Sequence, residues 1–273
     1  MADREKYRPF TGDSDKSVRL ANAPLVLVLC QVRWPGLGSL QSEDQLRALA
    51  PMFGEKVPSY PLFSEAKNIN YVITPEGINQ TTAGNIYQWA SADDVWHISL
   101  ARRFITVYCN HYSDYDVFDT RLREALEALQ TVVQVPIVDR VGVRYVNRVP
   151  IQSANELNEL VPSEVLGLQA LSLQCPGPEL QNATNQAAYS VDGATLLVRS
   201  GVFPPNSTVD PAIPPLTDTA SWVLDLDSSV EQRQLFVVDS VATTASRMSD
   251  IAYDYFKLIV KDAFIQRFTE EES

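Results

Sequence analysis

Histidine and cysteine are the residue types in this sequence best suited to catalysis or metal binding. The two histidines, His97 and His111, are not spaced with Cys, Asp or Glu as histidines are in zinc or iron sites. Cys109 and His111 lie two apart in an extended segment, but no neighbouring residue is placed to orient the histidine as a base. A Walker loop, a dinucleotide fingerprint and a serine nucleophile elbow are also absent from the sequence. We therefore expect no metal and no cofactor, and we favour a protein that is not an enzyme.

Asp225 and Asp227 are a second candidate for chemistry. They lie two apart in the strand-like run 222–227, so both carboxylates share one face, opposite the apolar residues of the run. A pair with this spacing can serve acid/base catalysis or bind a divalent ion. Together with His97 it defines an alternative site for a small ligand or a reaction. Taken alone, His97 reads as a polar surface residue.

A row of arginines marks the segment 140–149, which reads RVGVRYVNRV. Side chains alternate between faces along a strand, so Arg140, Arg144 and Arg148 share one face, while three valines and Tyr145 share the other. The whole protein has 22 basic and 34 acidic residues and a net charge of −12. A basic face on one strand of such a protein needs an explanation.

Three interpretations of the row are open. The arginines can pair with Asp225 and Asp227 across the strands of a solvated face, each pair contributing roughly 0.2–1 kcal/mol. They can instead bind an acidic partner, because a guanidinium offers two parallel hydrogen bonds to a carboxylate or phosphate. They can also form a buried ion network between two halves of the protein. The second interpretation predicts these partner-binding residues: Arg33, Arg140, Arg144, Arg148, Asp225 and Asp227.

The elements that carry these residues follow one order twice along the chain. The first half reads as a strand at 24–34, a short helix at 42–53 capped by Ser42, a hairpin at 86–100, a strand at 104–110 and a helix at 114–133 capped by Ser113. The second half reads as a strand at 140–149, a short helix at 155–167, a hairpin at 187–202 that turns at Asp192-Gly193, a strand at 222–227 and a long closing helix. The inner stripe of that closing helix is Met248, Ile251, Tyr255, Leu258 and Ile259. A strand-like piece at 234–240 has no counterpart in the first half, and prolines leave 57–83 unassigned.

This order predicts an α+β fold produced by tandem duplication of strand, short helix, antiparallel meander and long helix. The first repeat covers residues 21–135, and the second covers 136–273 with a proline-rich loop at 204–220. Joining the two meanders gives one curved antiparallel sheet with both long helices on one face. In element order alone, this architecture resembles the saddle of the TATA-binding-protein fold. Residues 1–20 are expected to form a flexible N-terminal arm.

Composition limits the location and the partners of the protein. The longest apolar run, 24–30, is far shorter than the roughly 20 residues that cross a bilayer, so we expect no membrane span. The charged N-terminus lacks the apolar core of a secretory signal, which predicts a cytoplasmic protein. Three widely spaced cysteines predict no disulfide. The acidic balance argues against nonspecific binding of nucleic acid.

Several segments resemble a known family. Val32-Arg33-Trp34-Pro35 closes the first strand, Trp96 lies in a hairpin, and Arg144-Tyr145-Val146-Asn147 lies in the arginine strand. These features are similar to a sporadically distributed prokaryotic family of comparable length whose function is uncharacterised. The resemblance implies a compact, non-secreted prokaryotic protein and carriage with mobile or defence gene clusters.

The function expected from these observations is binding of another protein without catalysis. The arginine face would contact an acidic patch of the partner, in the setting of an antitoxin, an immunity protein or a phage-defence component. The alternatives are a nucleic-acid-binding protein that uses the same face and a small-ligand protein or enzyme with a site near His97. An exposed sheet edge or the N-terminal arm would allow a homodimer.

Overall fold

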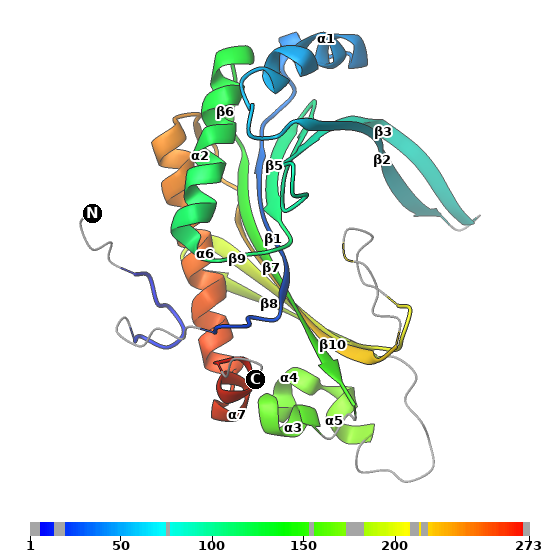
Figure 1. Ribbon diagram of the computed structural model, residues 1–273, viewed down its shortest axis with the longest axis vertical. Helices are drawn as coiled ribbons and strands as arrows, with labels where there is room; N and C mark the ends of the chain where they lie inside the picture. The colour runs from blue at the N-terminus through cyan, green and yellow to red at the C-terminus, as the bar shows by residue number, and fades with distance from the viewer. Residues whose placement is uncertain are drawn as a thin grey trace. The chain divides into compact units, whose positions relative to one another are not determined.

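The protein is mixed α+β, as the sequence predicts. The computed structural model describes residues 6–13, 20–74, 77–152, 156–172, 183–207, 213 and 218–269, without the side chains of 68–74, 77–83 and 171–172. These residues form seven α-helices and a large, mostly antiparallel sheet of nine strands (Figure 1).

In the nine-stranded sheet, the strands of the first half of the chain and those of the second half follow the same order of neighbours. The order is β2-β3-β4-β5-β1-β7-β10-β9-β8. Their bounds are β1 Leu25–Arg33, β2 Leu62–Thr74, β3 Gly77–Ala90, β4 Trp96–Ala101, β5 Phe104–Cys109, β7 Arg140–Ile151, β8 Ala183–Val191, β9 Ala194–Phe203 and β10 Ala220–Val230. From β1 the neighbours are β5, β4 and β3, and from β7 they are β10, β9 and β8, as duplicated meanders predict. Strand β2 has no counterpart and fills part of the segment left unassigned.

The helices follow the predicted order with local corrections. Their bounds are α1 Glu43–Gly54, α2 Tyr115–Val132, α3 Glu156–Leu160, α4 Ser163–Leu166, α5 Leu168–Ser172, α6 Val238–Ile259 and α7 Asp262–Thr269, with a 3-10 turn at Gly38–Leu40. Ser42 caps α1, as expected, and the structure adds a reciprocal capping box with Gln45. Asp114, and not Ser113, caps α2 through a bond from the Val117 N–H. The single short helix expected at 155–167 is broken into pieces.

The expected strand at 234–240 is mostly wrong. Only Gln234–Leu235 is extended, as β11, which pairs with β6 (Ile137–Val138). From Val238 onward the chain is helical, because the half-buried Val238 begins an apolar stripe at helical spacing that continues with the buried Val241 and Ala245. Within that stripe Met248 and Ile251 are buried, but Leu258 is 53% exposed and does not belong to the core.

The chain forms two compact units, and β1 and β7 run from one into the other. Unit 1 takes its residues from 1–28, 143–230 and 247–273, and unit 2 takes them from 29–142 and 231–246. In unit 2, the buried Phe118 of α2 packs on Trp96 of β4, with ring centroids 5.8 Å apart. In unit 1, Met248 of α6 lies against Ser228 of β10. In each unit, therefore, a long helix covers one face of the strands.

Part of the expected N-terminal arm is held in place. Residues 6–13 are hydrogen-bonded to α6 through Asp250 and Asp254, so they do not form a loose arm. The expectation rested on composition, which cannot show a partner more than 200 residues away in sequence. Most of the proline-rich loop and Cys175 lie outside the described residues.

The two described cysteines, Cys30 and Cys109, are buried free thiols. Burial raises the pKa of each thiol to about 12, so at pH 8 only about one molecule in 10⁴ carries the reactive thiolate. In a Cys175→Ser variant we expect almost no reaction with a disulfide reagent at pH 8 in the folded state, and release of both thiols in denaturant. Absorbance measures the reaction. Rapid labelling of either thiol in the folded state would contradict this packing.

Candidate functional site

Arg144 and Asp225 form a close ion pair on the face of unit 1 that points away from α6. Tyr145, the next residue, points the opposite way, and its hydroxyl lies 2.7 Å from that of Ser249 on α6. Arg144 donates from Nε to Asp225 Oδ1 at 2.8 Å and from Nη2 to Oδ2 at 3.0 Å. The Asp225 side chain is only 4% exposed. The predicted meeting of the arginine row with the aspartates therefore takes place at this pair.

Arg199 is a third member of the cluster, and sequence reasoning missed it. It lies on β9 directly opposite Asp225, with its Nη1 3.2 Å from Asp225 Oδ2. Its side chain is 41% exposed, against 16% for Arg144. Aligning the hairpin of 187–202 against the strand of 222–227 in antiparallel register was the signal that could have found it. We call Arg144, Asp225 and Arg199 the arginine cluster; it lies within unit 1.

The structure contradicts the predicted solvated face at Arg148. It is 7% exposed, and burial lowers the pKa of its guanidinium. Alternation along a strand sets which face a side chain occupies, but not whether that face is covered. The interpretation of an exposed arginine row is therefore wrong at this residue. Asp227 lies on the same face as Asp225 and is half-buried.

Arg140 and Arg33 belong to unit 2. The Arg140 guanidinium lies 3.2 Å from Gln31 Oε1 and 4.0 Å from Glu231 Oε1. It lies flat over Gly142, where a Cβ would come within 2.8 Å of Nη1, so glycine is needed for this approach. Arg33 is exposed at the end of β1, and in the described part of the chain its side chain has neither a hydrogen bond nor an ion pair.

His97 borders a shallow hollow in unit 2. Its ring stacks on Tyr108 at 4.5 Å, and its Nε2 lies 3.0 Å from the Asp94 carbonyl. The hollow has a volume of about 290 Å³ and lies among β2, β3, β4 and β5. Three strands, β5, β1 and β7, separate β4 from β10 in the sheet order, so the aspartates expected beside His97 lie on a strand that is not its neighbour. Among the described residues, no group of three or more His, Cys, Asp or Glu side chains could hold a metal ion.

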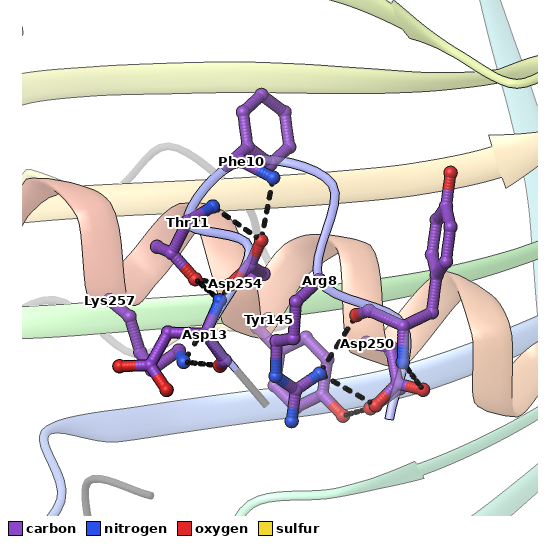
Figure 2. Close-up of polar contacts among 10 residues, drawn as sticks. Arg8, Phe10, Thr11, Asp13, Tyr145, Asp250, Asp254 and Lys257 are labelled. Atoms are coloured by element: carbon purple, nitrogen blue, oxygen red, sulfur yellow. Dashed lines mark hydrogen bonds and ion pairs between the residues drawn. The ribbon is translucent and has the colours of Figure 1, made fainter. Parts of the chain in front are cut away.

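A second polar cluster lies on α6 and was not anticipated. Asp254 is fully buried and accepts hydrogen bonds from the Phe10 and Thr11 N–H groups at 2.7 and 3.0 Å (Figure 2). One turn earlier, Asp250 binds Arg8 at 3.0 Å. No sequence pattern pointed to this contact, because its two sides come from opposite ends of the chain.

Comparison with known proteins gives no assignment. No family model matches the chain, and no curated protein matches it. Of the helices that the structure describes, none combines the length and apolar character needed to cross a membrane.

Proposed function

We propose that this protein binds another protein without catalysing a reaction, through the sheet face that carries the arginine cluster. One observation carries the proposal: Arg199 is partly exposed yet anchored. Its single polar contact among the described residues is the one to Asp225, which Arg144 already binds through two hydrogen bonds. A guanidinium has five N–H donors, so Arg199 retains donors for a carboxylate of a partner.

The surroundings of Arg199 suit an approaching chain. In the register of β8 and β9 it faces Gln186. The pairs two positions away, which lie on the same face, are Ala188 with Leu197 and Thr184 with Gly201. Strand β8 is an edge of the sheet and carries no charge and no proline. An uncharged edge strand can accept a further strand, so main-chain pairing and a contact to Arg199 can act together.

The charge of the face that carries the arginine cluster indicates how a partner would be recognised. The arginine cluster carries one net positive charge, which Asp227 on the same face offsets. The protein as a whole has a net charge of −12. Long-range attraction of an acidic partner is therefore not the mechanism. The contact is instead local, since charges beyond about 8 Å are screened at physiological salt. The partner is thus a segment that places one carboxylate on Arg199.

The test is quantitative capture followed by a binding measurement. Wild-type protein expressed in a prokaryotic host is captured at low and high salt, and a stoichiometric protein that comes with it is purified. We expect Arg199→Glu to weaken binding of that protein at least about tenfold, as loss of a charged contact of 1.4 kcal/mol or more implies.

Arg233→Glu is the matched control. Arg233 is exposed and belongs to unit 2, so this variant makes the same charge change at a residue outside the cluster, and its affinity should equal that of wild type. Equal weakening by both variants, or no weakening by Arg199→Glu, would reject the proposed face. Nucleic acid retained at low salt and released at high salt would instead favour the nucleic-acid alternative. The antitoxin or phage-defence setting implied by the family resemblance is part of the proposal, and the identity of the partner tests it.

A further inference from the structure

Helix α6 presents a stripe of charged residues to the N-terminal segment. The stripe is Arg247, Asp250, Asp254 and Lys257, spaced three, four and three residues apart, so one residue lies at each turn on one side of the helix. Residues 7–13 run along this stripe in the direction of the helix, as the contacts below show (Figure 2). The stripe and the segment therefore match turn by turn.

Some of the contacts between the stripe and the N-terminal segment involve only the main chain of the segment. Asp254 accepts the Phe10 and Thr11 N–H groups, and Lys257 Nζ donates to the Asp13 carbonyl at 2.9 Å. The Asp254 side chain is 0% exposed and that of Lys257 is 4% exposed. A turn over residues 9–11 presents these main-chain groups: the Gly12 N–H donates to the Arg8 carbonyl at 3.1 Å, and Gly12 has a φ of 65°. The main-chain contacts therefore require a segment that can form this turn.

Side chains of the segment add specificity. Arg8 donates to Asp250 at 3.0 Å, and its guanidinium lies 5.0 Å from the centre of the Tyr253 ring. Its side chain is 7% exposed. The Thr11 hydroxyl donates to Asp254 Oδ1 at 2.5 Å. A basic residue and a hydroxyl residue three positions later are thus recognised separately.

An aromatic slot holds the residue between them. The Phe10 ring meets Tyr189 of β8 and Tyr255 of α6 edge-on, at centroid distances of 5.6 and 5.3 Å. The two tyrosine rings are themselves 5.3 Å apart. Edge-to-face pairs of this kind contribute beyond the apolar area that they bury. The slot therefore selects an aromatic side chain two positions after the arginine.

We infer that the α6 stripe and this slot form a peptide-binding groove, which the chain's own N-terminal segment occupies in competition with a segment of another protein. The ligand is a peptide that turns after an arginine, with phenylalanine and threonine at positions i+2 and i+3 and a glycine at i+4, where the turn has a positive φ. Asp250 complements the arginine of the ligand, whereas the stripe as a whole, with Arg247 and Lys257, carries no net charge. The contacts join residues 242 to 244 apart, so the segment with its turn is held as a tethered ligand. The inference does not depend on Arg199 or on the function proposed above.

Tethering makes the competition measurable. A ligand tied to its site by a short linker acts at an effective concentration of about 1 mM, which masks the groove from free peptide. A double variant of the full chain, Arg8→Ala with Phe10→Ala, removes the arginine and phenylalanine contacts of the tethered segment and leaves the groove intact. We expect a fluorescent peptide with the sequence of residues 6–13, KYRPFTGD, to bind this variant at least about tenfold more tightly than wild type by anisotropy.

Three controls make the result decisive. The peptide with alanine at the positions of Arg8 and Phe10 should not bind, and adding Asp254→Asn to the double variant should abolish binding. In wild type, millimolar peptide should speed hydrogen exchange at the Phe10 and Thr11 amides, which tests the groove without any substitution. Equal binding to variant and wild type, or no binding and no change in exchange, overturns the inference. A dimer that exchanges N-terminal segments, detected by sedimentation, would overturn the external ligand in favour of a second copy.

Discussion

Replacing Arg144 with methionine is expected to lower the free energy of unfolding by about 3 kcal/mol, because removing one partner of a buried ion pair leaves a buried charge poorly compensated. The Asp225 side chain is 4% exposed and receives two of its hydrogen bonds from Arg144. Arg199 remains, but it contributes a single contact at 3.2 Å. Urea unfolding followed by circular dichroism measures the change.

Arg199→Met is the matched comparison. This substitution removes the more exposed partner of the same carboxylate, so it should cost less than about 1 kcal/mol. A double replacement, Arg144→Met with Asp225→Leu, should recover most of the lost stability, because two apolar side chains leave no buried charge that needs a partner. Equal costs for the two arginines would show that Asp225 is not held mainly by Arg144. The comparison also separates stability from the proposed partner binding, since Arg144 is expected to contribute to stability and Arg199 to the proposed contact.

Asp254→Ala is expected to lower the free energy of unfolding by about 3 kcal/mol. The substitution leaves the Phe10 and Thr11 N–H groups without their acceptor and removes the carboxylate 3.7 Å from the nearly buried Lys257 ammonium. Hydrogen bonds to a charged group contribute about 1.5–3 kcal/mol each when buried. Thermal and urea unfolding measure the loss, and amide exchange at Phe10 and Thr11 should become fast.

Asp239→Ala provides the control on the same helix. Asp239 lies in the first turn of α6 and is 88% exposed, with Arg123 as its ion-pair partner. An exposed pair of this kind contributes less than about 1 kcal/mol. A loss of similar size for both variants would mean that the N-terminal segment adds nothing specific to stability.

Local patterns in the sequence were enough to predict much of the fold. Apolar residues at helical spacing located α2, and alternation along 140–149 placed Tyr145 toward α6 and Arg144 away from it. The Asp192-Gly193 turn was readable because both residues need positive φ in a type I′ hairpin, and the structure has φ of 45° and 80°. Each of these features depends only on residues within one element.

The candidate sites depend on contacts between elements, and for these the sequence was not sufficient. Arg199 joins Asp225 because β9 and β10 pair in one register, and a shift of one residue would place the arginine on the other face. Arg148 has the alternation of an outward residue, yet it is buried. The N-terminal segment looked like a charged arm, yet its amides bind a carboxylate 244 residues away. Periodicity reports the face of a residue on its own strand or helix, whereas burial and pairing depend on which distant segments the folded chain brings against that face.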